Sequence, residues 1–277
     1  MPGVLIITDS STCLPAEISH SLDIMILPIS VHLPDAASAI VEEADGSTWE
    51  LTGDLATEEL MGANHPFVTE YLSSIETPGY DAALVITPAV EFSTMFRNAA
   101  LASELATRPT VVHDSRTAAA GQALVVLAAA RAAQRGETLE GVRAVAEIAS
   151  RRVVLVASLA SVEPILRSGE VAEEVLTHDD DPGARSHFKM RDGVIEPLGS
   201  APDALSSLAL LCEAYRSGTG GGVEASTVFH AGAQPLADDL AELAGGVDFI
   251  SGFSIAMQVY TGTGVVGIAW LPATMAG

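Results

Sequence analysis

The stretch LVITPAVEFSTMFRNAALA at Leu84–Ala102 joins a buried strand to a helix through a short polar loop. Its first residues are apolar and β-rich, and Pro88 ends the strand because proline cannot donate to a ladder. Ser93 or Thr94 can then cap the helix. A helix N-terminus offers unpaired N–H groups and a partial positive charge, so the stretch predicts a site for the carboxylate of a small acidic molecule. The alternative is an ordinary helix cap.

Strands and helices alternate through the first half of the chain. Continuous apolar runs predict buried strands at Val4–Thr8, Ile24–Val31, Leu84–Thr87 and Thr110–His113. Helices are predicted at Pro66–Ile75, Ala118–Arg135 and Leu139–Ser150. The Ala-rich helix contains the most apolar long run of the chain, and Gln122 and Arg131 within it indicate a buried helix rather than a membrane span. This alternation is typical of a parallel βαβ sheet.

The pattern changes after Ser150, where we place a boundary between residues 1–150 and residues 151–277. The second half carries more hairpin signals, of which Asp192-Gly193 is the strongest. Strands are predicted at Val153–Ser158, His187–Arg191, Val194–Pro197, Ala225–His230, Phe253–Tyr260 and Val265–Leu271. Helices are predicted at Val162–Arg167, Ala204–Tyr215 and Pro235–Ala244. The whole chain is therefore expected to be a two-domain α/β protein.

The strongly acidic composition excludes several classes of partner. The formal net charge is −23, with only 13 lysines and arginines against 36 aspartates and glutamates. A nucleic-acid-binding protein needs a basic face for phosphates, and docking on an anionic membrane needs basic residues too. Hydrophobic residues make up 48 % of the chain, which is enough for a large core. The N-terminus passes directly into a strand without a signal peptide, so we expect a cytoplasmic protein.

Hydroxyl and carboxylate side chains follow three of the predicted strands. They are Asp9-Ser10-Ser11, Asp114-Ser115 and Ser93. In an open α/β sheet, ligands bind outside the carboxyl ends of the strands, so these residues are candidates for one crevice. For Asp9 and Asp114 the alternative is that each caps or ties down a turn.

Recognised catalytic motifs are absent from the sequence. It contains no G-x-S-x-G elbow, Walker loop or strand-linked G-x-G-x-x-G, and its histidines lack metal-ligand spacing, so no cofactor or metal is predicted. A Ser–His–Asp site could be assembled from Ser93, His230 and Asp114, but with seven histidines in the chain such a choice is almost unconstrained.

Motifs along essentially the whole chain resemble the DegV family of bacterial fatty-acid-binding proteins. They are IITDSSTCLP at Ile6–Pro15, LPISV at Leu27–Val31, the Ser93 loop, VVHDSRTAAAGQALVVLAAARAA at Val111–Ala133, ILRSGEV at Ile165–Val171, MRDGVIEPL at Met190–Leu198, FHAGAQPLADDLAEL at Phe229–Leu243 and YTGTGVVGIAW at Tyr260–Trp270.

The resemblance implies a parallel sheet in the first domain, a mixed or antiparallel sheet in the second, and a long-chain fatty acid held between them. Family members can present the acid to a partner kinase, so the resemblance implies a carrier and not an enzyme. The chain departs from the family at four motifs, one of which is Ser168-Gly169-Glu170 in place of Gly-Gly-Arg, so that a basic group is lost. The other three lie at the expected head-group site. There the chain has Ala63-Asn64-His65-Pro66 for Thr-Ser-Gln-Pro, Ser93-Thr94-Met95 for Ser-Gly-Thr, and Tyr260-Thr261-Gly262-Thr263-Gly264 for His-Thr-Gly-Pro-Gly.

Ser93 is accordingly expected to bind the carboxylate, with Asn64 and Tyr260 as substitute donors. The full set of expected ligand-binding residues is Ser93, Thr94, Asn64, Tyr260, Thr261, Asp9, Ser10, Ser11, Asp114 and Ser115. Two other functions stay open on the sequence. One is a serine-dependent hydrolase that uses Ser93, and the other is a divergent member without ligand that acts by protein contact.

Overall fold

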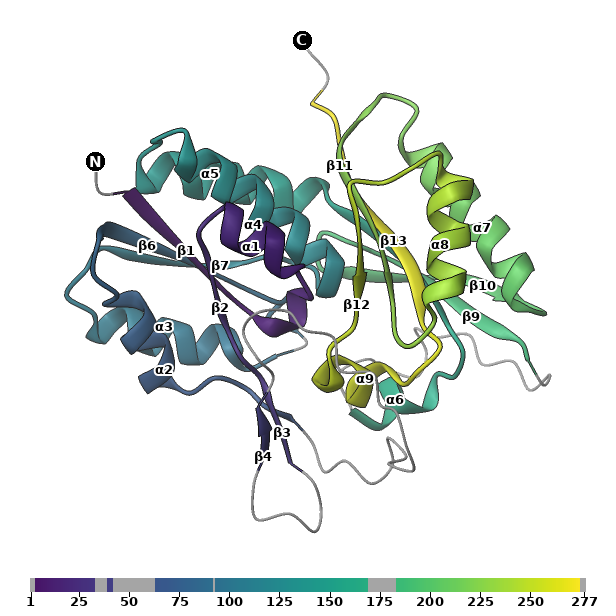
Figure 1. Ribbon diagram of the computed structural model, residues 1–277, viewed down its shortest axis with the longest axis horizontal. Coiled ribbons are helices and arrows are strands. Elements are labelled where there is room, and N and C mark those ends of the chain that lie inside the picture. The colour runs from purple at the N-terminus through teal and green to yellow at the C-terminus, as the bar shows by residue number, and fades with distance from the viewer. Residues whose placement is uncertain (1–2, 33–38, 42–62, 92, 169–182, 275–277) are drawn as a thin grey trace.

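The computed structural model describes residues 3–32, 39–41, 63–91, 93–168 and 183–274 of the chain. Two large sheets stand side by side, each with helices packed against it (Figure 1). The elements up to the second sheet are β1 (Gly3–Asp9), η1 (Ser10–Thr12), α1 (Ala16–Ser21), β2 (Ile24–Leu27), β3 (Ser30–His32), β4 (Ala39–Val41), β5 (Ala63–Asn64), α2 (Val68–Ile75), β6 (Tyr80–Thr87), α3 (Met95–Leu105), β7 (Thr110–Asp114), α4 (Ala119–Gln134) and α5 (Leu139–Arg152). The later elements are β8 (Val154–Leu159), α6 (Glu163–Ser168), β9 (Arg185–Arg191), β10 (Val194–Ala201), α7 (Ala204–Gly218), β11 (Val223–His230), α8 (Gln234–Ala244), β12 (Phe249–Gly252), α9 (Ile255–Thr261) and β13 (Val266–Pro272).

The first sheet is parallel, as the alternating strands and helices predicted. Its strand order is β2-β1-β6-β7, and β1 lies between its neighbours with Ile6 opposite both Ile24 and Leu84. Successive side chains of β1 point to opposite faces. Leu5 and Ile7 therefore join the core under α2 and α3, whereas Ile6 joins the core under α4 and α5. Burial on both faces explains why the strand sequences are continuously apolar.

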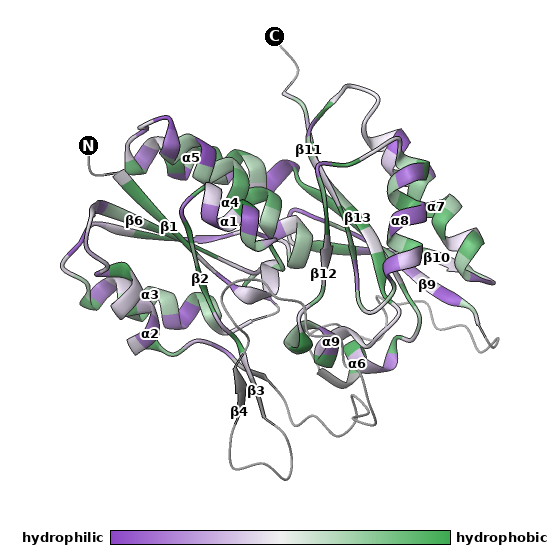
Figure 2. Ribbon diagram, in the orientation of Figure 1, coloured by the Kyte–Doolittle hydropathy of each residue, from purple (hydrophilic) through white to green (hydrophobic). Residues whose placement is uncertain are grey.

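The second sheet is mixed, in agreement with the family resemblance. Its order is β10-β9-β8-β13-β11-β12, and all neighbours are antiparallel except the β11–β12 pair. Helices α7 and α8 cover its outer face (Figure 1). Figure 2 shows hydrophilic residues along both of these helices, whereas β13, which both helices contact, is mainly hydrophobic. The inner face of the sheet is turned toward α4.

Helix α4 packs between the two sheets. It contacts β1 and β6 of the first sheet and β8, β11 and β13 of the second. All of its residues are buried except Arg131, Ala133 and Gln134. A helix that is apolar around its whole circumference must be covered on all sides, so the buried helix predicted here is confirmed. One hydrophobic core runs through α4 from Ile6 in β1 to Ala269 in β13.

Two predicted elements differ from the structure. The predicted strand Ile24–Val31 is split at Pro28, and its two halves, β2 and β3, belong to different sheets. The predicted strand Phe253–Tyr260 is wrong, because Ile255–Thr261 is helix α9 and the strand at this place is β12. Ser254 caps α9 by accepting a hydrogen bond from the backbone N–H of Met257 at 3.3 Å. The apolar run itself has no clear period, so the cap decides its conformation.

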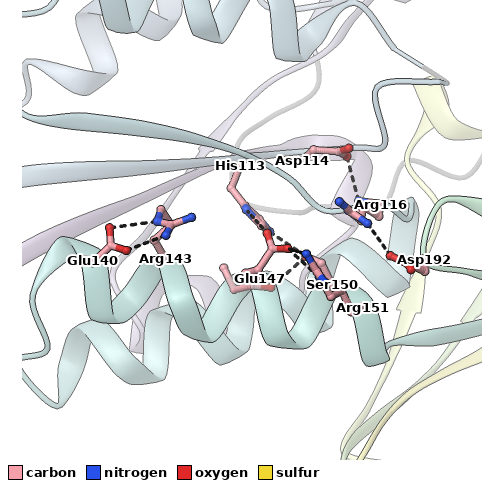
Figure 3. A network of polar contacts seen from close by, with 10 residues as sticks. His113, Asp114, Arg116, Glu140, Arg143, Glu147, Ser150, Arg151 and Asp192 are labelled. Atoms are coloured by element: carbon pink, nitrogen blue, oxygen red, sulfur yellow. Dashed lines mark hydrogen bonds and ion pairs between the residues drawn. The ribbon is translucent and has the colours of Figure 1, made fainter.

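The predicted hairpin at Asp192-Gly193 is confirmed, and it connects the two halves of the molecule. Both turn residues have positive φ angles, 50° and 79°, as a type I′ turn requires. The carboxylate of Asp192 accepts from the Arg116 guanidinium at 2.8 Å (Figure 3). The Gly193 N–H donates to the Arg116 carbonyl, also at 2.8 Å. The predicted boundary at Ser150 falls in the last turn of α5, between β7 and β8, and the two domain ranges stay a prediction.

Gly267 of β13 provides a test of how closely the inner face of the second sheet is packed. A Cβ atom built there would lie 2.5 Å from the carbonyl oxygen of Val156 and would overlap the ring of Phe229. Neither group can turn away, since one is backbone and the other is a buried aromatic ring. We expect Gly267→Ala to lower the free energy of unfolding by about 1–3 kcal/mol, measured by urea denaturation.

Gly3→Ala is the matched control, because Gly3 also lies in a strand but has open space around its Cα. It should change the free energy of unfolding by less than about 0.5 kcal/mol. Equal stability of the two variants would contradict the close packing at Gly267.

Candidate functional site

A largely apolar cavity lies between the inner face of the second sheet and the first half of the molecule. The cavity has an internal volume of about 130 Å³, and the wider space that includes its opening to solvent is about 910 Å³. One wall is formed by the inward side chains of β8, Leu155, Ala157 and Leu159. The rings of Phe229 and Phe253, stacked with centroids 5.4 Å apart, form another part of the lining.

Few polar residues line this cavity, and they come from distant parts of the sequence. Ser11 follows β1, His65 precedes α2, Ser93 precedes α3, and Tyr260 and Thr261 end α9. Of the ten residues predicted from the sequence, Ser11, Ser93, Tyr260 and Thr261 therefore lie on the cavity. The polar lining therefore combines residues from both halves of the chain, because α9 belongs to the second half and the other three residues belong to the first.

Ser93 stands where the strand–loop–helix stretch predicted it. Its Oγ accepts a hydrogen bond from the backbone N–H of Met95 at 3.1 Å, so this serine does cap the first turn of α3. Because that bond uses a lone pair of Oγ, the hydroxyl hydrogen can be donated to a ligand. Thr94 is the exposed N-cap residue of α3, and its own hydroxyl makes no cap bond. Capping and ligand binding are thus compatible at Ser93.

His65 connects the first half of the chain to the second at the cavity. Its Nδ1 lies 3.1 Å from Oγ1 of Thr94, and its Nε2 lies 3.2 Å from the hydroxyl of Tyr260. Burial lowers the pKa of the imidazole below its ordinary value of 6.5. The contact with Tyr260 joins residues 195 positions apart in the sequence. The sequence alone therefore gives no sign that His65 and Tyr260 are in contact.

Thr261 lies beside Tyr260 at the C-terminus of α9. Its hydroxyl donates to the carbonyl of Met257 at 2.9 Å, within the same helix. The residue lines the cavity, but this bond shows that its hydroxyl also stabilises the last turn of α9.

Asp9 and Ser10 tie together the carboxyl end of β1 and lie outside the cavity lining. The buried Asp9 carboxylate accepts from the backbone N–H of Ser11 at 3.0 Å and from the Gln122 amide at 3.1 Å. The Ser10 hydroxyl accepts from the backbone N–H of Ile29 at 3.0 Å. These bonds match the turn-stabilising alternative that the sequence left open for Asp9. Only Ser11 of this group lines the cavity.

Asp114 and Ser115 likewise stabilise a turn. Asp114 accepts from the backbone N–H of Arg116 at 2.9 Å, and burial raises the pKa of its carboxyl (Figure 3). The Ser115 hydroxyl donates to the carbonyl of Thr117 at 3.1 Å. Neither residue is part of the cavity lining.

The hypothetical Ser93–His230–Asp114 triad has no support in the described contacts. The Nε2 of His230 lies 2.8 Å from Oε1 of Gln234, and its Nδ1 accepts from the backbone N–H of Ala233 at 3.2 Å. His230 follows Phe229 in β11, so the two side chains point to opposite faces, and it is Phe229 that lines the cavity.

Asn64 could be placed only in part, and His65 was missed as a site residue. The backbone of Asn64 pairs with Ser30 in β5, but its side chain lies outside the described part of the chain. His65 is the next residue, in a loop that the sequence showed only as a cluster of turn residues. A signal existed, because the family has glutamine at this position. The role of histidine in place of glutamine at this position depends on its contact with Tyr260, and only the folded structure shows that contact.

The described residues offer neither a metal site nor a membrane-spanning helix. They contain no group of three or more histidine, cysteine, aspartate or glutamate side chains that could hold a metal ion. Within the same residues, none of the helices combines the length and the hydropathy that crossing a bilayer would require.

The fold and the cavity define an α/β protein with two large sheets and an apolar cavity between them. A family model described as "uncharacterised protein, DegV family" matches residues 3–273. The chain belongs to the DegV family, as its motifs indicated.

Relatives and solved structures agree with this assignment. A DegV domain-containing protein of Streptomyces coelicolor is 25 % identical over 274 residues, which cover 96 % of this chain and 97 % of that protein. A DegV domain-containing protein of Mycobacterium tuberculosis is 29 % identical over 174 residues, and this match covers 61 % of the chain and only 59 % of the mycobacterial protein.

The fold is shared with solved DegV proteins. The crystal structure of a DegV lipid-binding protein from Thermotoga maritima superimposes with a TM-score of 0.81 at 19 % identity, covering 98 % of each chain. DegV of Bacillus subtilis, described as a fatty acid binding protein, gives a TM-score of 0.80 at 18 % identity and covers 99 % of this chain and 100 % of its own.

Gln122 tests whether Asp9 has a structural role. The Gln122 amide in α4 donates to Oγ1 of Thr8 at 3.0 Å and to the buried Asp9 carboxylate. Because Gln122→Leu leaves that carboxylate with one donor fewer, we expect the free energy of unfolding to fall by about 1–3 kcal/mol in urea denaturation.

The matched control is Gln134→Leu on the exposed end of the same helix, where the amide donates to the carbonyl of Ser21 at 2.9 Å. Its effect should stay below about 0.5–1 kcal/mol. If both variants lose the same stability, the bond to Asp9 does not hold β1 against α4.

Proposed function

We propose that the protein holds a long-chain fatty acid, or a related acidic lipid, in the cavity between its two sheets and acts as a carrier and not as an enzyme. The observation that carries the proposal is the cavity itself, whose lining is apolar except for a few hydroxyls and one imidazole. An apolar tail with a single polar head matches this lining. Lipid binding by solved proteins of the same fold supports the proposal.

The energetics favour the tail as the main source of affinity. Burying one CH₂ group contributes about 0.8 kcal/mol, so roughly fifteen such groups contribute on the order of 10 kcal/mol before the costs of ordering. A hydrogen bond to a charged group contributes about 1.5–3 kcal/mol. The head group therefore orients the lipid, and losing one contact weakens binding without abolishing it.

Ser93 is the residue that we assign to the carboxylate. Its Oγ is held by the Met95 N–H and lines the cavity. Tyr260 and Thr261 contribute further hydroxyls from α9. In this arrangement the lipid bridges the two halves of the chain, since Ser93 precedes α3 and Tyr260 ends α9.

The carrier is favoured over a serine hydrolase because the candidate acid and base are engaged elsewhere. Asp114 accepts from Arg116, and both ring nitrogens of His230 have partners at α8. A cytoplasmic location and delivery of the acid to a fatty acid kinase complete the proposal. Both are supported by the resemblance to the family and not by any contact described above.

Direct recovery of lipid tests the function. Protein purified from a bacterial host should release about one fatty acid per chain on solvent extraction and mass analysis. After delipidation it should take up oleate or palmitate, detected by native mass spectrometry. A preparation that is lipid-free and takes up neither acid would rule out the carrier and favour a member that acts through protein contacts.

Ser93→Ala tests the head-group assignment. The loss of one hydrogen bond to a charged group should weaken oleate binding by about tenfold, with at most about 1 kcal/mol of folding stability lost from the cap. The measurement is competition against a fluorescent fatty acid.

Ser161→Ala is the matched control, because Ser161 also accepts from the backbone N–H two residues ahead, at 3.2 Å, and is exposed outside the cavity. It should leave oleate affinity unchanged. An affinity that is equally unchanged in Ser93→Ala would reduce Ser93 to a helix cap.

A further inference from the structure

An acidic ligand in the cavity would bring a negative charge that the described lining residues compensate poorly. Among the described residues that line it, none is lysine or arginine, and His65 carries the only ionisable nitrogen. An ionised carboxylate is costly to bury unless a positive charge or several hydrogen bonds compensate it. The imidazole of His65 is therefore the group among these residues that can supply a positive charge to the head of the ligand.

The contacts of His65 suit a protonated imidazole. In the neutral ring one nitrogen donates and the other accepts, so one of its two hydroxyl partners must direct its hydrogen at the ring. In the imidazolium both nitrogens donate, to Oγ1 of Thr94 and to the hydroxyl of Tyr260. The Tyr260 hydroxyl then accepts from the imidazolium, and Tyr260 lines the cavity beside it.

We propose that His65 takes up one proton from solvent when the protein binds an ionised fatty acid, and that the His65–Tyr260 pair thereby selects acids over neutral lipids. The inference rests on the proposed carrier function and assigns the head-group chemistry of that site. His65 is on this view a residue that determines specificity, and its contact with Tyr260 holds the imidazole at the cavity.

The surroundings of His65 disfavour the charged form of its imidazole in the empty protein. Burial alone lowers the pKa of its imidazole below 6.5. The ionisable side chains on neighbouring elements are Glu70 of α2, Glu91 and Arg97 around the start of α3, Glu163 of α6 and Tyr260 of α9, and none of them shifts this pKa. Glu70 is engaged with the backbone N–H of Phe67. A carboxylate placed in the cavity would bring a negative charge close to the imidazole, and it would raise the pKa of His65.

The sign of the pH dependence follows from proton linkage. Binding raises the pKa of His65, so the complex holds more protons than the separate partners between the two pKa values. Affinity for the acid must then increase as the pH falls through this window, by at most about tenfold per pH unit for one proton. A neutral lipid raises no pKa and should bind with the same affinity throughout.

Calorimetry of delipidated protein with decanoate and with 1-decanol tests the proposal. Between pH 5.5 and 7.5 the acid stays ionised, because its carboxyl titrates near 4–5. We expect decanoate to bind roughly fivefold to tenfold more tightly at pH 5.5 than at pH 7.5. Titrations in two buffers of different ionisation enthalpy at pH 6.5 should show net uptake of up to one proton per decanoate. Decanol binding should show neither effect.

The variant His65→Gln keeps an amide donor and acceptor but cannot take up a proton. Its decanoate affinity should vary less than about twofold across the same pH range, with no proton uptake. The matched control is His20→Gln, the same substitution at an exposed histidine of α1, which should keep the full pH dependence. A pH dependence that persists in His65→Gln would place the proton on the ligand and overturn the proposal.

NMR titration of the His65 imidazole in the wild-type protein covers the case in which the variant does not fold. Its pKa should rise on addition of decanoate and stay unchanged on addition of decanol. An unchanged pKa with decanoate bound would also overturn the proposal. Failure of both ligands to bind would instead reject the carrier function, so the two failures are distinguishable.

Discussion

The packing of α4 between two sheets is the interaction on which the rest of the structure depends. Small residues such as Ala120, Gly121 and Ala123 cover much of this helix and let both sheets approach it closely. The same burial that removes α4 from water joins the cores of the two halves into one. Without it each sheet would expose one apolar face, which is costly in proportion to its area.

The position of the cavity follows from this packing. Ala118 and Ala119 at the start of α4 are part of the cavity lining. The cavity therefore lies just beyond the N-terminus of α4, where the helix no longer fills the space between the sheets. At this point the inward side chains of β8 line the cavity. An apolar site between the sheets is thus a consequence of where α4 starts, and its polar end is formed by loops that surround this point.

The polar end differs from the apolar lining in how it is built. The apolar walls come from strand positions. The alternation of side chains along a strand fixes which of these positions face the cavity, so the walls do not depend on the exact conformation of the loops. Ser93, His65 and Tyr260 instead come from loop and helix termini of both halves. Their relative positions depend on the contact of the first half with the second, including the Arg116–Asp192 ion pair. The geometry of this polar end is therefore the property most sensitive to how the two halves meet.

The sequence alone determined the parallel first sheet, the buried α4 and the Asp192-Gly193 hairpin, because periodicity and turn chemistry are local properties. It also placed Ser93 at the start of a helix. Tertiary structure decided which strand-end residues reach the cavity, and it left Asp9 and Asp114 in turns. It decided α9, whose apolar sequence fits a strand or a helix equally well. It also decided the His65–Tyr260 contact, since residues 195 positions apart meet only through the packing of both sheets on α4.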